Sequence, residues 1–205
     1  MDSNKINLDV LIVGTGFAGM YMLYRMKRLG LSVLAIEAAS DVGGTWYWNR
    51  YPGARCDVES VEYSYSFSEE LQQEWEWSNR YSDQPEILEY ANHVADRFDL
   101  RADIKFETKV TSAHYNSDSK SWDVETDMGD FYSARFCVMA TGTLSAPNAP
   151  NFEGLDTFKG DWYMTSKWPH ESLDFSDKKV GIIGTGSTGI QAIPVVAEES
   201  KHLTV

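Results

Sequence analysis

The sequence has few cysteines and no long apolar run. Its two cysteines, Cys56 and Cys137, lie far apart in the chain, and their spacing fits neither a paired redox motif nor a set of metal ligands. The first nine residues are polar, and the apolar run from Val10 to Val13 is too short for a signal-peptide core or a membrane span. These absences predict reduced thiols in a cytoplasmic protein that has no metal site and no membrane partner.

Basic residues are also scarce. Lys and Arg number 18 against 31 Asp and Glu, which gives a formal net charge of −13, and the basic residues are scattered. Nucleic acid is not an expected partner, because a phosphate backbone is normally met by a clustered basic surface. What the sequence does contain is 42% hydrophobic and 13% aromatic residues. That content is enough to build a folded core in 205 residues.

The first forty residues predict a strand, a tight turn, a helix and a second strand. A strand from Asp9 to Val13 ends at Gly14, and apolar residues then recur at helical spacing from Ala18 to Leu29 before Gly30 supplies a stop. Leu31 to Ile36 is the second strand. This βαβ unit implies parallel pairing and an α/β fold.

The middle of the chain predicts loops, one helix and a β-meander. Asp41 to Trp77 is rich in Gly, Trp and Tyr without clean periodicity, which is typical of segments that wrap a ligand. After Pro85, apolar residues fall on one helical face as far as Phe98. Three strands are expected next: Ile104 to Tyr115, Ser121 to Thr126 and Phe131 to Ala140.

Gly14, Gly16 and Gly19 form a glycine motif between the first strand and the helix. In such a motif the glycines permit a tight turn, close approach of a pyrophosphate and packing of helix on strand. The helix N-terminus favours an anion there. Glu37 ends the second strand, where a carboxylate can accept hydrogen bonds from ribose hydroxyls. We expect a dinucleotide site; the alternative is a glycine turn in another α/β fold.

The same arrangement returns near the end of the sequence. A strand from Val180 to Ile183 leads into the motif Gly184 to Gly189, a helix from about Thr188 to Glu199 and a new strand at Leu203. Two dinucleotide sites suggest two redox cofactors, and a nicotinamide that passes a hydride to a flavin is the usual pair. The residue that would choose between NADH and NADPH falls just beyond Val205.

Several segments resemble the Baeyer–Villiger monooxygenases, class B flavoprotein monooxygenases of the cyclohexanone and phenylacetone monooxygenase type. Gly43 to Trp48 with Tyr51 to Asp57 is similar to their flavin-wrapping segment, and Ala140 to Gly142 with Pro147 to a second flavin-contacting strand end. Phe158 to Pro169 is similar to the fingerprint Phe-x-Gly-x-x-x-His-x-x-x-Trp-Pro. The resemblance spans essentially the whole chain and implies the N-terminal part of such an enzyme. The cysteine spacing argues against flavin disulfide reductases.

One residue departs from the fingerprint: Met164 stands where the family has histidine. A thioether neither donates a strong hydrogen bond nor titrates near neutral pH. Two interpretations stay open, a methionine that fills an apolar gap or a change that weakens the coupling of nicotinamide binding to flavin chemistry. Trp168 and Pro169 argue against N- or S-oxygenating flavin monooxygenases, whose fingerprint lacks this ending.

The resemblance implies chemistry that depends on NADPH and FAD. NADPH reduces FAD, O2 adds to the flavin C4a atom, and the peroxyflavin inserts one oxygen atom beside a ketone carbonyl to give an ester or lactone. The protein holds the peroxide, positions the ketone and excludes water. In the family an arginine does much of this, and it is held by an aspartate that matches Asp57, the expected catalytic residue. Arg55 resembles a nicotinamide-contacting residue; an ordinary surface charge is the alternative.

Carried over residue by residue, the resemblance implies two sets of cofactor contacts. Around FAD it implies Gly14, Gly16, Phe17, Ala18, Gly19, Glu37, Gly44, Thr45, Trp46, Asp57, Tyr63 and Val110. Around NADP(H) it implies Arg55, Thr185, Gly186, Ser187, Thr188, Gly189 and Gln191. For the aromatic residues, packing in the core is the alternative.

Three regions follow from the resemblance: a Rossmann-like FAD-binding domain over 1–144, a linker with the fingerprint over 145–178 and the start of a Rossmann-like NADP-binding domain over 179–205. One strand and one helix cannot bury their own faces. Apolar patches are therefore expected to seek a missing C-terminal segment or a second copy. A second hypothesis is a flavin-binding fragment that is inactive on its own.

Overall fold

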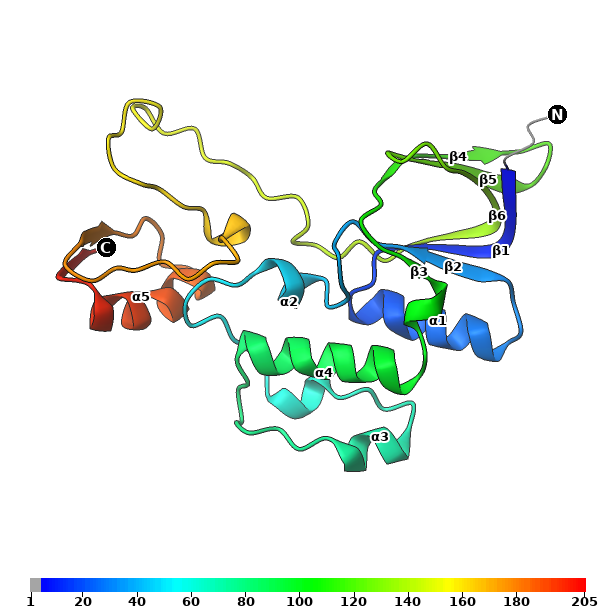
Figure 1. Ribbon diagram of the computed structural model, residues 1–205, viewed down its shortest axis with the longest axis horizontal. Coiled ribbons are helices and arrows are strands. Elements are labelled where there is room, and N and C mark those ends of the chain that lie inside the picture. Colours follow the sequence, from blue (N-terminus) through cyan, green and yellow to red (C-terminus); the bar gives the residue numbers. More distant parts are fainter. Residues whose placement is uncertain (1–4) are drawn as a thin grey trace. The chain divides into compact units, whose positions relative to one another are not determined.

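The computed structural model describes residues 5–205, and the chain forms two compact units (Figure 1). The first unit consists of Met1–Tyr47 and Ala91–Ser145, and the second of Trp48–Tyr90 and Ala146–Val205. The first four residues of the predicted FAD-binding domain lie outside the described residues. Each unit is thus assembled from two separate stretches of chain.

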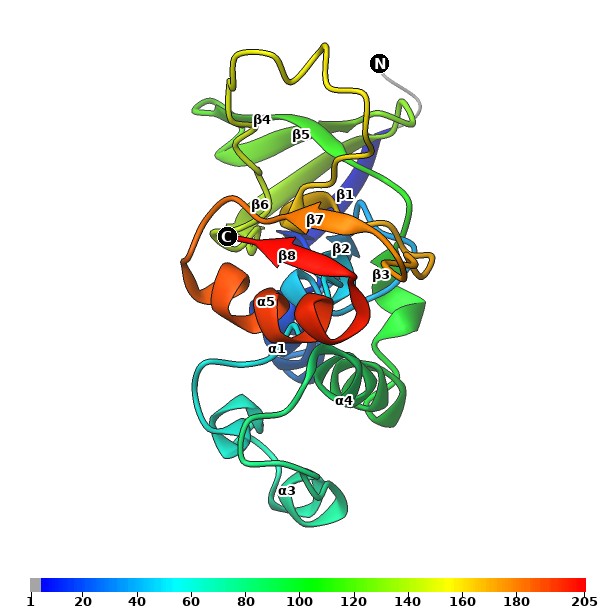
Figure 2. The same ribbon diagram turned by 90° about the vertical axis from the view of Figure 1, so that its left-hand side faces the viewer.

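A six-stranded sheet dominates the first unit (Figure 1, Figure 2), with the strand order β3-β2-β1-β6-β5-β4. The strands are β1 (Lys5–Val13), β2 (Val33–Ile36), β3 (Ile104–Lys105), β4 (Val110–Asn116), β5 (Ser121–Thr126) and β6 (Phe131–Met139). β1 pairs in parallel with β2 and β6, and β2 with β3. β4, β5 and β6 form an antiparallel meander, with a register shift in β4 between Val110 and Ser112. The predicted α/β fold is confirmed.

Helix α1 (Phe17–Arg28) connects β1 to β2 as the apolar spacing predicts. It buries Gly19, Met20, Leu23 and Tyr24. Gly30 follows the helix end with a φ of +72°, a left-handed conformation that glycine adopts at little cost. A buried cluster joins the parallel strands to the meander: Leu11, Ile36, Val124, Tyr132 and Ala134.

The region predicted as one strand from Ile104 to Tyr115 is two strands, and this part of the prediction is wrong. β3 pairs with β2, whereas β4 joins the meander. Between them Glu107 has a φ of +50°. The N–H of Glu107 donates to the carbonyl of Ala39, and the N–H of Thr108 to the carbonyl of Glu37. The loop after β2 therefore binds backbone groups that a continuous strand would pair with its neighbour.

Short helices interrupt the region predicted as ligand-wrapping loops. They are α2 (Thr45–Trp48), the 3-10 helix η1 (Ser60–Tyr63) and α3 (Glu69–Glu74). The hydroxyl of Ser68 accepts a hydrogen bond from the N–H of Leu71 and caps α3. The helix expected after Pro85 is α4 (Gln84–Arg97), followed by the 3-10 helix η2 (Arg101–Asp103).

The C-terminal stretch of the second unit contains the predicted strand, helix and strand. β7 (Lys179–Gly181) pairs in parallel with β8 (His202–Thr204), and α5 (Ser187–Glu199) connects them. The 3-10 helix η3 (Thr165–Lys167) precedes them. Ile183 is 81% exposed and Ile190 64%. Exposed apolar side chains on this piece agree with the expectation that it does not bury its own surfaces.

Candidate functional site

The first glycine motif is a bend between β1 and α1 in which backbone atoms pass unusually close. Gly14 has a φ of +97°, and a Cβ there would lie 2.7 Å from the carbonyl oxygen of Ala140. A Cβ on Gly19 would lie 1.9 Å from the carbonyl oxygen of Gly14. Distances this short leave no room for a side chain, so the bend needs glycine at both positions.

The loop after β2 approaches the same bend. Gly44 has a φ of +53°, and a Cβ on it would lie 2.8 Å from the Cα of Gly16. The N–H of Gly43 donates to the carbonyl of Thr15 at 3.1 Å. Gly16 is the N-cap residue of α1 and forms no side-chain cap. Bare backbone at the positive end of a helix is the kind of surface that accepts a phosphate group.

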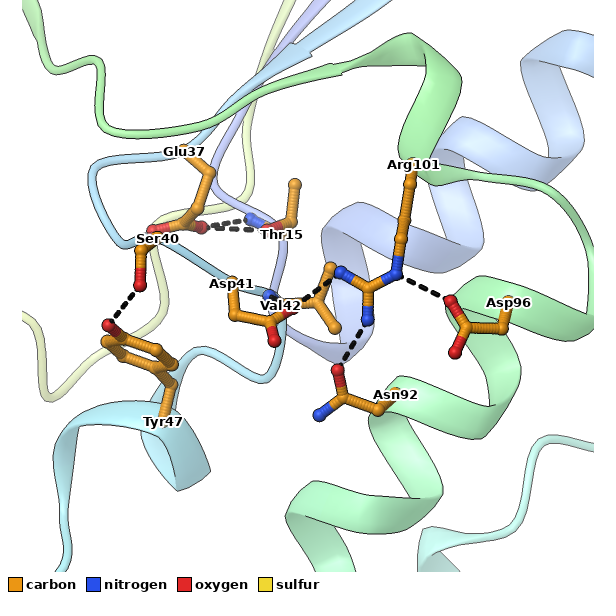
Figure 3. A network of polar contacts seen from close by, with 9 residues as sticks. All are labelled: Thr15, Glu37, Ser40, Asp41, Val42, Tyr47, Asn92, Asp96 and Arg101. Atoms are coloured by element: carbon orange, nitrogen blue, oxygen red, sulfur yellow. Dashed lines mark hydrogen bonds and ion pairs between the residues drawn. The ribbon is translucent and has the colours of Figure 1, made fainter.

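The carboxylate of Glu37 is turned back toward this bend (Figure 3). Its Oε2 accepts hydrogen bonds from the N–H of Thr15 at 2.7 Å and from the Thr15 hydroxyl at 2.9 Å, and its Oε1 accepts from the N–H of Ala39 at 2.8 Å. Glu37 is only 5% exposed. Because a carboxylate has about four acceptor positions, three protein donors leave capacity for one further donor such as a ribose hydroxyl.

Arg101 holds the loop that leads to the glycines of the flavin-wrapping segment (Figure 3). Its guanidinium donates to Asp41 at 2.6 Å, to Asp96 at 2.5 Å and to the side-chain oxygen of Asn92 at 2.5 Å. Burial by itself lowers the pKa of Arg101, but hydrogen bonds to Asp41 and Asp96 outweigh it and raise that pKa above its ordinary value. Asp41 also accepts from the N–H of Val42 at 2.7 Å. Arg101 is not among the residues predicted from the sequence, because its partner Asp41 lies 60 positions away in the chain.

The other expected FAD contacts of the first unit differ in burial. Trp46 lies in α2 and is 7% exposed, whereas Thr45 beside it is exposed. In the first turn of α1, Phe17 is half-buried and Ala18 exposed. Val110 begins β4 and packs against the buried cluster of the sheet. The exposed residues are open to a ligand as they stand, whereas Trp46 is buried and Val110 is partly buried.

Three predicted site residues belong to the Trp48–Tyr90 stretch of the second unit. Asp57 and Arg55 are exposed, and Tyr63 is half-buried at the end of η1. Asp57 follows Cys56, whose N–H donates to the carbonyl of Ser82 at 3.0 Å. An exposed carboxylate carried by a segment with fixed backbone can pair with an incoming cation.

The second glycine motif repeats the geometry of the first. Gly184 has a φ of +114°, and a Cβ on Gly189 would lie 2.4 Å from the carbonyl oxygen of Gly184. Gly186 is the N-cap residue of α5 and forms no side-chain cap. The neighbouring Thr185 and Ser187 are exposed, and Thr188 is half-buried. Gln191 differs, because its amide is bound to the backbone of Arg55.

The fingerprint segment forms a 3-10 turn rather than a long element. The carbonyl of Met164 accepts the N–H of Lys167 at 2.9 Å, and this bond begins η3. The ring of Trp168 lies 5.8 Å from that of Tyr163 and 6.2 Å from that of Phe175. The turn uses the backbone of Met164, so it does not depend on the side chain at this position.

Three negative expectations concern metals, disulfides and membranes. Within residues 5–205, no group of His, Cys, Asp and Glu side chains is arranged to hold a metal ion. Both cysteines are free, Cys56 buried and Cys137 half-buried. Among the described residues, no helix combines the length and apolar character needed to cross a membrane.

Comparisons with known proteins agree with the resemblance seen in the sequence. Residues 11–205 match the family model described as pyridine nucleotide-disulphide oxidoreductase. A Baeyer–Villiger monooxygenase of Pseudooceanicola batsensis is 52% identical over 200 residues, which cover 97% of this chain and 36% of the relative. The phenazine N-monooxygenase PhzNO1 of Lysobacter antibioticus is 46% identical over 206 residues, covering 100% of this chain and 38% of the relative. More distant relatives are named FAD-binding monooxygenases.

A solved structure gives the same result for the fold. An oxidised steroid monooxygenase bound to NADP superposes with a TM-score of 0.92 at 60% identity, covering 96% of this chain and 38% of that one. The chain thus spans somewhat more than a third of the length of the proteins that it matches. The chain belongs to the pyridine nucleotide-disulphide oxidoreductase family and is a homologue of the Baeyer–Villiger monooxygenases.

Proposed function

We propose that the complete protein carrying this chain is an NADPH- and FAD-dependent Baeyer–Villiger monooxygenase. It would insert one oxygen atom of O2 beside a ketone carbonyl and give an ester or lactone. The observation that carries the proposal is the glycine bend of the first unit, with Glu37 bound to Thr15 beside it. The relatives of this name support the same reaction.

The first glycine bend would hold FAD. Bare backbone at Gly14, Gly16 and Gly44 fits a pyrophosphate, and the remaining acceptor capacity of Glu37 fits a ribose hydroxyl. When bound, FAD supplies the two-electron chemistry and the reaction with O2 that no amino-acid side chain provides. Thr45, Trp46, Phe17, Ala18, Tyr63 and Val110 would complete the FAD contacts.

The second glycine motif would hold the pyrophosphate of NADPH in the same manner, with Thr185 to Gly189 at the start of α5 and Arg55 as a further contact. Asp57 would orient a cation beside the reacting centre, because its carboxylate is exposed and its segment is fixed. A solved steroid monooxygenase of this fold is bound to NADP, which supports a nicotinamide cofactor for this protein as well.

Domain boundaries and partners form part of the proposal. Residues 1–144 would bind FAD, 145–178 would connect and 179–205 would begin the NADP-binding domain. The exposure of Ile183 and Ile190 supports a further segment or a second copy that covers this piece. Two free cysteines suit a reducing cytoplasm, where we place the protein.

The experiment is an oxygen-labelling assay on the full-length protein. NADPH oxidation is measured with and without cyclic, open-chain and steroid ketones under 18O2, and products are analysed by mass spectrometry. We expect ketone-dependent oxidation and one labelled oxygen atom in each ester or lactone. NADPH oxidation at the same rate with and without every ketone, with all consumed O2 released as hydrogen peroxide, would contradict the proposal. The absorbance of the purified 205-residue chain separately tests whether it retains flavin and is inactive on its own.

A second candidate is N-oxygenation of an aromatic heterocycle. The observation that favours it is the 46% identity to a phenazine N-monooxygenase, close to the 52% identity to a Baeyer–Villiger monooxygenase. Under this candidate the fingerprint ending Trp168-Pro169 would not separate the two reactions. Offering phenazine and a ketone in one competition assay separates them, because N-oxide and ester are different products.

A further inference from the structure

The side chain of Gln191 is bound to the backbone of Arg55 in both directions. Its Oε1 accepts the N–H of Arg55 at 3.3 Å, and its Nε2 donates to the carbonyl of Arg55 at 3.1 Å. The hydroxyl of Tyr51 donates to the same Oε1 at 2.8 Å. A primary amide carries one N–H and one C=O that match those of a peptide unit. Gln191 therefore pairs with Arg55 as a neighbouring strand would.

The opposite edge of this short segment is already paired. Arg55 forms an antiparallel bridge with Asp83. The N–H of Cys56 donates to the carbonyl of Ser82 at 3.0 Å, and the N–H of Gln84 donates to the carbonyl of Ala54 at 2.8 Å. With Gln191 on its free edge, the segment is fixed from both sides just before it reaches Asp57.

The backbone of the Tyr51–Arg55 segment also lies directly on α5. A Cβ on Gly53 would lie 2.3 Å from the carbonyl oxygen of Gln191 and 3.1 Å from Cγ2 of Val195. Gly53 has a φ of +75°, which a side chain would strain. Contact between the segment and the helix therefore involves the main chain of both, and the Gln191 amide sets its register.

We propose that Gln191 is a positioning residue that couples the nicotinamide helix α5 to Asp57 through the backbone of Arg55. This inference rests on the proposed function, in which α5 receives NADPH and Asp57 orients the catalytic cation. The Oε1 of Gln191 already accepts two hydrogen bonds from the Tyr51–Arg55 segment. The Gln191 side chain therefore binds this segment rather than the nucleotide. Movement of α5 when NADPH binds would thus be transmitted to Asp57 through the Arg55 backbone.

The test compares Gln191→Met with Glu198→Met in the full-length holoenzyme. Methionine keeps the length of glutamine and removes both hydrogen-bonding groups, and Glu198 is an exposed residue of the same helix. The first readout is the rate at which iodoacetamide alkylates Cys56, which is 2% exposed and donates from Sγ to Ser82. We expect roughly tenfold faster alkylation in Gln191→Met only, as loss of the three hydrogen bonds between Gln191 and the Tyr51–Arg55 segment implies.

The second readout is the ester or lactone formed per NADPH oxidised. We expect Gln191→Met to lower this ratio roughly fivefold with FAD content unchanged, because Asp57 loses its fixed position. Tyr51→Phe removes one bond to the same amide and should lower the ratio less. In the double variant Tyr51→Phe should add nothing, since its partner is already gone.

Several outcomes separate this inference from the proposed function. The inference would be overturned if Cys56 in Gln191→Met is alkylated at the wild-type rate and the product formed per NADPH oxidised is unchanged. A change confined to the KM for NADPH would overturn it as well. If Gln191→Met does not fold, full coupling in Tyr51→Phe with unchanged alkylation of Cys56 overturns it as well. A wild-type enzyme without ketone-dependent turnover would instead sink the proposed function, while the alkylation rates still report whether Gln191 holds the segment.

Discussion

Thr15 binds the carboxylate of Glu37 twice, through its backbone N–H at 2.7 Å and its hydroxyl at 2.9 Å. These two hydrogen bonds hold the glycine bend together with Glu37, the residue expected to bind the ribose. Both side chains are buried, and a hydrogen bond to a buried charge contributes about 1.5–3 kcal/mol.

Glu37→Gln should therefore weaken FAD binding at least tenfold, because a neutral amide replaces the acceptor of three protein donors. Thr15→Val removes only the hydroxyl bond and should lower the free energy of unfolding by about 1 kcal/mol, with a smaller effect on FAD. Flavin release measured by fluorescence gives the affinity. Glu125→Gln, at an exposed position of β5, is the control. Equal FAD affinity in Glu37→Gln and this control would contradict the proposed ribose contact.

Gly19→Ala should destabilise the first unit by about 3 kcal/mol or prevent its folding, because its Cβ would lie 1.9 Å from the carbonyl oxygen of Gly14. Gly181→Ala is a matched control, since a Cβ there meets no atom within 4 Å. Thermal unfolding followed by circular dichroism gives both stabilities. A Gly19→Ala protein as stable as the control would contradict the close approach of the Gly19 and Gly14 backbones.

Arg101→Met should loosen the loop before Gly43 and Gly44 and lower FAD affinity roughly fivefold. Three acceptors, Asp41, Asp96 and Asn92, lose a common donor at once, and a network of this kind contributes more than a single surface ion pair. Arg97→Met at the end of α4 is the control for loss of one nearby positive charge. Flavin titration measures the FAD affinity of both variants. An equal loss of affinity in both would rule out a specific role for Arg101.

Acid should weaken the link between the parallel strands and the meander. The hydrogen bond from Lys105 lowers the pKa of Asp130 below its ordinary value of 3.8. A carboxyl whose pKa is lowered by folding stabilises the fold above its unfolded pKa, and that contribution is lost as pH falls through the folded pKa. Stability should thus fall below about pH 4, and less steeply in Asp130→Asn. Urea unfolding at several pH values measures this, with Asp118→Asn as the control.

Met164→His should raise the coupling of NADPH oxidation to product in the full-length enzyme. The backbone of Met164 already forms the turn of η3, so the substitution should leave the fold intact while it restores a side chain able to donate a hydrogen bond. Turnover and hydrogen peroxide release are measured side by side. If neither changes, this position does not tune catalysis and the methionine only fills space.

The parts of the site that follow local patterns could be predicted from the sequence. Glycine spacing located both bends, and the end of an apolar run located Glu37. The break in the strand after Ile104 could not be predicted, because it depends on Glu107 and Thr108 binding the loop after β2. The same holds for the hydrogen bonds that Arg101 and Gln191 form. Their partners Asp41 and Arg55 are distant in the chain, so no spacing rule connects them.

The two edge strands of the sheet, β3 and β4, limit the addition of a strand from another chain. β3 has only two residues, so it offers almost no edge for an added strand. β4 is longer but carries the register shift between Val110 and Ser112, which makes it a poor template for pairing with another chain. The net charge of −13 adds mutual repulsion between copies. Both edges of the sheet therefore disfavour polymerisation by the addition of strands from other copies.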